Sequence, residues 1–170
     1  MFLCPAFFEA GRITVNDTHY IEEQGRRIPT SDTEFAGDSV FCYSSSHLPS
    51  YVEEKTGGRI PADRVRSLSV QLLRNPDPAA LIDFLRELQH QEYAVVNAER
   101  YEDLYRLADA LLAAVAEGKR FCFQSAAAAV PSGKSESRQI PFVIFPGNVG
   151  DDRTLLHVIT FLDSPVPSSR

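Results

Sequence analysis

The feature that most constrains the fold is an alternation of short apolar segments with amphipathic segments in the middle of the chain. Residues 93–98 form an almost wholly apolar run, typical of a strand buried on both faces of a parallel sheet, and residues 65–70 and 120–124 are predicted as further strands. Residues 79–88 and 101–117 carry apolar side chains at helical spacing. Strands and helices in this order build βαβ units, so the sequence predicts an α/β domain with a mainly parallel sheet and flanking helices.

Start and stop signals bound the predicted helices. Asp77 supplies a capping carboxylate and Pro78 a suitable first residue for the helix at 79–88. Gly118 is placed to end the helix at 101–117. A further helix is predicted after the serines at 44–46, whose hydroxyls can cap its first turn, and the glycines at 57–58 would end it.

The N-terminal segment is predicted to add a β-hairpin to this sheet. After an apolar first strand, alternating segments at 13–15 and 18–21 are separated by Asn16 and Asp17, which is the pattern of a hairpin. Residues 24–38 are polar and rich in turn-forming residues, so we expect a surface loop there. Near the C-terminus, residues 131–138 are predicted as a linker, and the apolar segments at 142–145 and 155–162 as one or two further strands.

Size, charge and hydropathy exclude several classes of protein. A chain of 170 residues with 44% apolar composition fits one domain with its own core. The net charge of −6 gives no positive field for a nucleic-acid backbone or an anionic membrane, so neither is an expected partner. The apolar runs are far shorter than the ~20 residues of a spanning helix, and the N-terminus lacks the basic region of a signal peptide. The three separated cysteines, Cys4, Cys42 and Cys122, are interpreted as reduced, packed thiols, which favours a cytoplasmic location.

No single motif identifies a reaction. The segment 147–152 combines two glycines with two acids, but it matches neither the phosphate-loop pattern nor the dinucleotide pattern, so an ordinary turn is favoured. The four histidines are scattered without the spacing of metal ligands, so no metal site is expected.

Three places in the sequence are candidates for ligand binding. His47 follows Ser45 and Ser46 at a predicted helix start, where hydroxyls and free amides can hold an anion, although a capped helix with a solvent-facing imidazole explains the pattern equally well. Arg12 follows a buried strand and could grip a carboxylate or phosphate, but a surface salt bridge to a nearby acid is modestly favoured. Asn97 ends a buried strand, where open α/β sheets bind ligands, but it could equally bond to backbone at the turn.

A series of short motifs runs in order from about Met1 to Val130. These motifs are Pro5-Ala6-Phe7, Glu9-Ala10-Gly11-Arg12-Ile13-Thr14-Val15, His19-Tyr20, Thr33-Glu34-Phe35-Ala36 with Asp38, Tyr43-Ser44-Ser45-Ser46-His47-Leu48, Val52-Glu53-Glu54-Lys55-Thr56-Gly57-Gly58, Val95-Val96-Asn97-Ala98, Asp103-Leu104 and Gly118-Lys119-Arg120-Phe121. In order and spacing they resemble the four-carbon acid sugar kinases, some members of which carry the label Hrp-dependent type III effector.

The resemblance implies an ATP-dependent kinase of two domains. In that family an N-terminal domain binds a small sugar acid such as threonate, erythronate or an oxo-tetronate, and a C-terminal domain binds ATP, with Mg²⁺ implied. Phosphoryl transfer depends on holding both substrates in line and neutralising charge. By position and chemistry, the residues expected to face the sugar-acid cleft are Arg12, Ser45, Ser46 and His47.

The chain also departs from the family pattern. It lacks the Ala-Asp-Asp-Leu-Thr-Gly-Ala and Lys-x-Asp-Ser-Thr-Leu-Arg-Gly type motifs, and Gln124-Ser125 stands where members tend to have Arg-Thr. Residues after Val130 do not resemble the nucleotide-binding half. We therefore expect a partial acid-sugar-binding domain at 1–130, an unmatched tail at 131–170, no catalytic residue, and no ATP or metal bound by this chain alone.

Two functional hypotheses follow from these observations. The first is a fragment of a four-carbon acid sugar kinase that is inactive alone; a missing strand would leave an unpaired edge, which favours self-association or a complementing fragment. The alternative is a non-catalytic module that binds a small acid or a protein partner, with an effector-like role.

Overall fold

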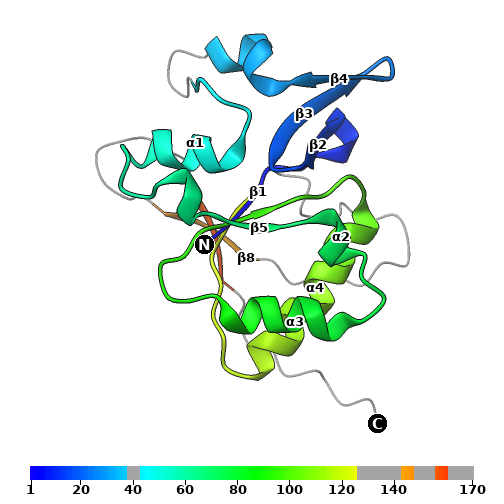
Figure 1. Cartoon of the computed structure of the whole chain (residues 1–170), viewed down its shortest axis with the longest axis vertical. Helices are drawn as coiled ribbons and strands as arrows, with labels where there is room; N and C mark the ends of the chain where they lie inside the picture. Colours follow the sequence, from blue (N-terminus) through cyan, green and yellow to red (C-terminus); the bar gives the residue numbers. More distant parts are fainter. Residues whose placement is uncertain (38–42, 126–142, 148–155, 161–170) are drawn as a thin grey trace.

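A four-stranded parallel sheet forms the centre of the molecule in the computed structural model, which describes residues 1–37, 43–125, 143–147 and 156–160 (Figure 1). Its strands are β1 (Phe2–Cys4), β5 (Arg66–Leu68), β6 (Ala94–Val96) and β7 (Phe123–Ser125). They lie in the order β5-β6-β1-β7, and every neighbouring pair is parallel. The predicted parallel α/β fold is confirmed, with the first strand of the chain in an interior position.

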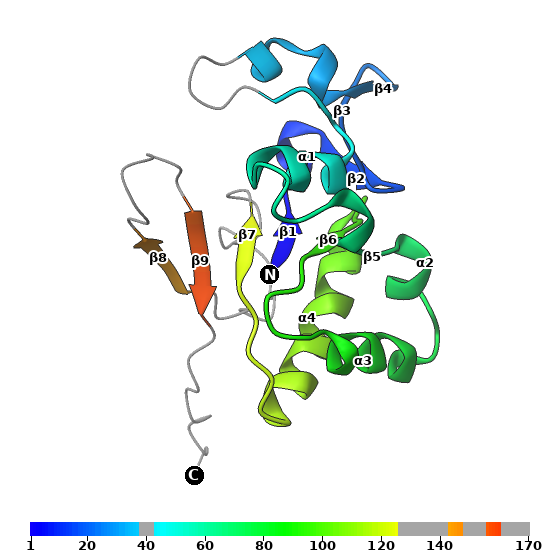
Figure 2. The ribbon, with the colours of Figure 1, turned by 60° about the vertical axis from the view of Figure 1, so that its left-hand side comes forward.

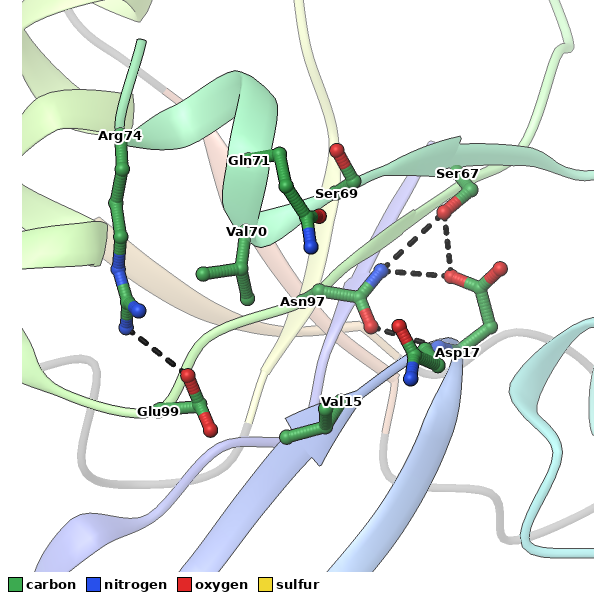
Figure 3. Close-up of a pocket in the computed structure, with 10 residues that line it drawn as sticks. Val15, Asp17, Ser67, Ser69, Val70, Gln71, Arg74, Asn97 and Glu99 are labelled. Carbon is green, nitrogen blue, oxygen red and sulfur yellow. Dashed lines mark hydrogen bonds and ion pairs between the residues drawn. The ribbon is translucent and has the colours of Figure 1, made fainter.

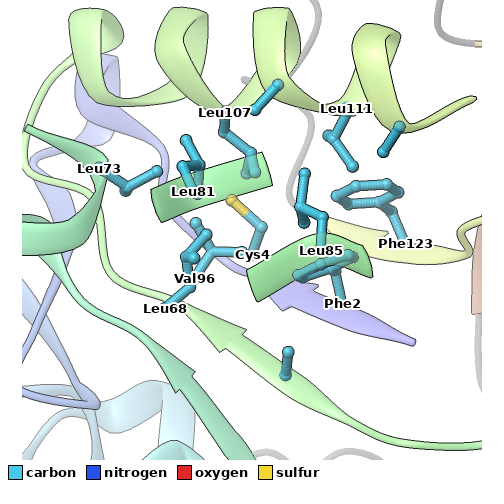
Figure 4. Close-up of a cluster of buried hydrophobic side chains, with 13 residues drawn as sticks. Phe2, Cys4, Leu68, Leu73, Leu81, Leu85, Val96, Leu107, Leu111 and Phe123 are labelled. Carbon is cyan, nitrogen blue, oxygen red and sulfur yellow. The ribbon is translucent and has the colours of Figure 1, made fainter. Parts of the chain in front are cut away.

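Three helices cover one face of this sheet: α2 (Val70–Leu73), α3 (Pro78–Glu87) and α4 (Tyr101–Ala116). Side chains alternate across a strand, and the set that points to this side packs against the apolar stripes of the helices (Figure 4). The main core consists of Phe2, Cys4, Leu68, Leu73, Leu81, Leu85, Ala94, Val96, Leu107, Ala110, Leu111, Ala114 and Phe123. Complete burial of a leucine such as Leu85 stabilises the fold by roughly 2 kcal/mol.

The opposite face of the sheet is covered by α1 (Leu48–Lys55). Leu3 of β1 and Val95 of β6 point to this side and pack against Leu48 and Val52 of the helix. Because Leu3 and Val95 lie between residues that point to the other face, both strands are buried on two sides. This explains why residues 93–98 form a continuous apolar run rather than an alternating one.

A three-stranded antiparallel sheet precedes α1, formed by β2 (Arg12–Val15), β3 (Thr18–Glu23) and β4 (Arg26–Pro29). Asn16 and Asp17, which join β2 to β3, have φ angles of 48° and 61°, so both residues adopt the left-handed conformation of a type I′ turn. The predicted hairpin is therefore confirmed.

The predicted surface loop at 24–38 is wrong in its first part, because residues 26–29 form strand β4. Arg26 pairs with Glu23 and Arg27 with Glu22 across the two strands. Its exposed arginines lie opposite glutamates of β3, and Arg27 forms an ion pair with Glu22 at 2.8 Å, so β4 has none of the apolar alternation by which strands are recognised in a sequence. Short 3₁₀ helices, η2 (Thr30–Asp32) and η3 (Glu34–Gly37), follow it.

The remaining boundaries differ modestly from the predicted ones. The strand predicted at 65–70 ends at Leu68, because the Ser69 hydroxyl accepts a hydrogen bond from the Leu72 amide at 3.1 Å and starts α2. Two more 3₁₀ helices are η1 (Phe8–Ala10) and η4 (Ala62–Arg64).

Strands β8 (Val143–Gly147) and β9 (Leu156–Thr160) form an antiparallel pair, with β9 beside β7 (Figure 2). The predicted linker at 131–138 lies outside the described residues, as does the glycine-acid turn predicted at 147–152 apart from Gly147, which ends β8.

Two of the three cysteines lie in the described part of the chain, and neither forms a disulfide. Cys4 is buried in the core, where desolvation raises the pKa of its thiol to about 12. Cys122 is exposed, so the prediction of a packed thiol is wrong at this position, which lies just before the short strand β7. Among the described residues, no helix combines the length and apolar character needed to cross a membrane.

Candidate functional site

A cavity of about 370 Å³ opens where strands β5 and β6 end, next to the turn between β2 and β3. In open parallel sheets, ligands bind outside the carboxyl ends of the strands, so its position is that of a ligand site. Figure 3 shows its lining side chains, which are Val15, Asn16, Asp17, Ser67, Ser69, Val70, Gln71, Arg74, Asn97 and Glu99.

At one end of this cavity, Asn97 holds the hairpin turn against the sheet. Its Oδ1 accepts a hydrogen bond from the Asp17 backbone amide at 2.7 Å, and its Nδ2 donates to Asp17 Oδ1 at 2.7 Å and to the Leu68 carbonyl at 3.2 Å. The Ser67 hydroxyl donates to the same Asp17 oxygen at 2.6 Å. Asn97 itself is only 1% exposed, whereas Asp17 is half-buried and Ser67 is exposed, so a buried amide holds the Asp17 carboxylate at the rim of the cavity.

At the other end, Arg74 follows the last turn of α2 and reaches the start of α4. Its Nε donates to Asp103 Oδ1 at 2.7 Å and its Nη2 to Oδ2 at 2.8 Å, while Glu99 Oε2 lies 3.1 Å from Nη2. Arg27 of β4 binds the other oxygen of Glu99 at 3.0 Å. Guanidinium groups of two different elements therefore hold Glu99 in place.

The buried Asp103 carboxylate stays ionised because of these contacts. Burial alone would raise its pKa, but the paired hydrogen bonds from Arg74 and the Glu99 amide outweigh burial and lower it. The pKa of Arg74 is raised, chiefly by its hydrogen bonds to Asp103. Both groups therefore remain charged across the physiological pH range, and the position of the guanidinium is fixed.

The four residues predicted to face the ligand lie elsewhere. Arg12 begins β2, opposite Ile21 and at the far end of that strand from the Asp17 turn. Ser46 is buried, and its hydroxyl binds Ser31 Oγ at 2.8 Å.

The other two predicted residues flank α1. Ser45 Oγ accepts the His47 amide at 3.2 Å, and the exposed His47 ring lies 2.9 Å from Ser50 Oγ. Residues 45–47 are brought beside β3 by the contact between Thr18 and His47. None of the four predicted positions lines the cavity, so their role in binding remains a prediction.

Asn97 fulfils both interpretations of its sequence position, because it lines the cavity and also bonds to backbone at the turn. Asp17, Ser67 and Arg74 were not singled out as site residues in the sequence. Asp17 carries the signal of a turn residue, Ser67 lies within strand β5, and Arg74 directly follows α2, a short helix that the sequence pattern does not predict. The rule that polar residues at strand ends gather at one edge would have drawn attention to Ser67 and Ser69.

The cavity has the functional groups needed to bind a polyhydroxylated molecule. Carboxylates and amide oxygens accept hydrogen bonds from hydroxyls, while amide nitrogens and a guanidinium donate to hydroxyls or carboxylates. The described residues hold no cluster of three His, Cys, Asp or Glu side chains suited to a metal ion. We still expect this chain alone to bind neither ATP nor Mg²⁺, and this expectation stays a prediction.

Comparison with protein families gives a match over most of the chain. Residues 1–132 match the profile of a family described as "Sugar-binding N-terminal domain". No curated protein matches the chain.

Two solved structures are similar over part of their length. A domain of unknown function from Bordetella bronchiseptica, a domain-swapped dimer with bound citrate, is 25% identical, with a TM-score of 0.47 over 65% of this chain and 23% of that chain. A Haemophilus influenzae protein is 17% identical, with a TM-score of 0.51 over 71% of this chain and 32% of that chain. The chain thus spans between 23% and 32% of the length of these proteins, and the second likeness shows a shared fold.

Proposed function

The chain belongs to the family of sugar-binding N-terminal domains, and we propose that it forms the acid-binding part of an ATP-dependent kinase for four-carbon sugar acids, inactive alone. The family match supports the coarser statement, a domain that binds a small sugar-like ligand. The finer statement rests on the resemblance of its motifs to the four-carbon acid sugar kinases. We assign ATP and Mg²⁺ to a separate nucleotide-binding domain of the full-length family.

The observation that carries this proposal is the polar cavity at the carboxyl ends of β5 and β6. Its volume of about 370 Å³ lies at the small end of the range for ligand sites and suits an acid of four carbons. Fixed acceptors lie at the Asp17 end, and a guanidinium fixed by Asp103 lies at the Arg74 end. A sugar acid offers hydroxyls to the first and a carboxylate to the second.

Titration of the folded chain with threonate and erythronate tests this proposal. We expect either acid to raise the melting temperature, since a ligand that binds only the native state stabilises it by mass action. Gln71→Trp should abolish the shift, because this exposed side chain lines the cavity and its replacement fills the space at little cost to folding.

Arg12→Gln and His47→Ala are the matched variants for the alternative site predicted from the sequence. Both should retain binding if the cavity holds the ligand. Loss of binding in these two variants, with retention in Gln71→Trp, would move the site to the face beside β3. A folded chain that responds to neither acid would argue against sugar-acid binding and favour a protein-interaction module.

A further inference from the structure

The two ends of the cavity differ in how their charges are compensated (Figure 3). At the Arg74 end, Arg74 forms ion pairs with both Glu99 and Asp103. Arg27 forms a second ion pair with Glu99, and the Arg100 Nε lies 3.9 Å from Asp103. At the opposite end, Asp17 forms no ion pair with any residue in the described part of the chain. Its partners there are the neutral groups of Ser67 and Asn97.

The geometry of these partners also leaves Asp17 with free capacity to accept. The Ser67 hydroxyl and the Asn97 amide both donate to Oδ1, and no described residue donates to Oδ2. A carboxylate oxygen without a donor is costly to leave unsatisfied when a ligand displaces water from it. A ligand hydroxyl satisfies this oxygen by donating to it, whereas a ligand carboxylate can only repel it.

We propose that Asp17 determines specificity in this cavity, by accepting a hydroxyl from the ligand and excluding a second carboxylate at that end. This inference rests on the proposed sugar-acid binding and adds the residue that separates an acid with a single carboxylate from a dicarboxylic acid. The ligand carboxylate lies at the Arg74 end and the terminal hydroxyl at Asp17. Dicarboxylic acids with the same carbon skeleton are rejected through charge repulsion at Asp17.

Threonate, tartrate and threitol form a matched series for the test. All three carry four carbons and differ in having one, two or no carboxylates. For the unmodified chain we expect threonate to bind at least about tenfold more tightly than tartrate, because two like charges a few ångströms apart in a partly shielded site repel strongly. Threitol should also bind more weakly than threonate, since it offers no carboxylate to Arg74.

Asp17→Asn and Asp17→Gly should bring the affinities for threonate and tartrate to within about threefold of each other. Both residues suit the left-handed conformation of the turn, so the fold is kept, and Asn can still accept from Ser67. Glu99→Gln is the control, because it removes the same charge from the Arg74 end of the cavity. It should tighten both acids and change the ratio between them less than either Asp17 variant does, because the second carboxylate of tartrate lies at the other end of the cavity.

Calorimetric titration of the four proteins separates the outcomes. Equal binding of threonate and tartrate by the unmodified chain, or an unchanged ratio in both Asp17 variants, overturns the inference about Asp17 alone. A folded, unmodified chain that binds none of the three compounds overturns the proposed function together with this inference.

Discussion

Asn97 links three segments that are far apart in the sequence. It receives the Asp17 amide from the hairpin turn, donates to the Leu68 carbonyl at the end of β5, and itself follows β6. An asparagine suits this position because it donates and accepts at once, whereas a hydrophobic residue would leave the turn amide unsatisfied. The cavity wall and the attachment of the antiparallel sheet thus depend on the same side chain.

Replacing Asn97 with alanine should lower the free energy of unfolding by about 2–3 kcal/mol. The variant loses several hydrogen bonds and leaves the Asp17 amide and carboxylate without their buried partner. Chemical denaturation measures the difference. Asn75→Ala is the matched control, since the Asn75 side chain makes a single exposed hydrogen bond, from the Asp77 amide, and its loss should cost less than about 1 kcal/mol. Equal losses in the two variants would contradict this role for Asn97.

His19 is a buried titratable residue in β3, and we expect it to make the free energy of unfolding depend on pH. Its ring nitrogen Nδ1 lies 3.1 Å from Thr14 Oγ1. Burial, reinforced by the charge of Arg12, lowers the pKa of the imidazole to about 4, although a backbone hydrogen bond to Ile13 acts in the opposite direction. The unfolded chain therefore takes up a proton near pH 6.5, where the folded chain takes up none.

Since the folded pKa is depressed, the contribution of His19 is fully present above about pH 6.5 and falls as the pH drops toward 4. Between pH 7 and pH 5 we expect a loss of about 2 kcal/mol from this residue. His19→Gln should flatten that part of the stability profile, measured by urea denaturation at each pH. His90→Gln, at an exposed position, should keep the unmodified slope; an unchanged slope in His19→Gln would show that other groups dominate.

The residues of the cavity show why the site is harder to predict than the fold. Asp17, Ser67 and Asn97 each have an ordinary local explanation, as a turn, a strand and a strand end. Their meeting depends on β5 lying next to β6 and on the hairpin folding back over both, which is set by long-range pairing. Arg12, Ser45, Ser46 and His47 are predicted from position and chemistry under the family resemblance, and they do not line this cavity.

Elements were predictable wherever burial leaves a periodic pattern. The two long helices and the central strands carry strong apolar signals, and the structure places them within a few residues of the expected bounds. Strand β4 and helix α2 have no such pattern, because β4 pairs with β3 through exposed polar residues and a single serine cap starts α2. Such elements depend on their neighbours more than on their own sequence.

The join between η1 and β2 is set by Gly11, which offers a matched test of backbone crowding. Gly11 has a φ of +64°, and a Cβ atom there would lie 2.6 Å from the Glu22 carbonyl oxygen. Gly25 has a φ of +75° but nothing within 4 Å of its Cβ position. Gly25→Ala should therefore cost only about 1 kcal/mol of strain.

Gly11→Ala has the same strain from its positive φ, and its Cβ atom also clashes with the Glu22 carbonyl. This carbonyl cannot move without breaking the β2–β3 pairing. We expect it to cost at least about 2 kcal/mol more than Gly25→Ala in the free energy of unfolding. Thermal and urea denaturation of the two variants give the comparison. Similar losses would mean that β3 shifts freely at Glu22 and that the join is not a rigid part of the antiparallel sheet.

At the scale of the whole molecule, the cavity lies between two sheets that hydrogen bonds and an ion pair join directly. The Thr14 amide donates to the Ala98 carbonyl at 3.0 Å, Asn97 binds the Asp17 turn, and Arg27 binds Glu99. A ligand that contacts Asp17 and Arg74 together would bridge the antiparallel sheet and the α/β core. Binding should therefore stabilise the junction of the two sheets most strongly.

We expect this chain to bind the sugar acid without phosphorylating it. Phosphoryl transfer requires a nucleotide cradle and charge neutralisation in line with the acceptor hydroxyl, and the described residues provide neither a phosphate loop nor a metal cluster. We expect the purified 170-residue chain to show a thermal shift with threonate and, in the same sample with ATP and Mg²⁺, no ADP above a protein-free control. A coupled ADP assay and mass detection of phosphothreonate measure the second part. The thermal shift shows that the chain is folded and that its site is occupied, so a negative kinase assay could not be explained by unfolded protein. Formation of phosphothreonate would show that the chain carries a complete active site.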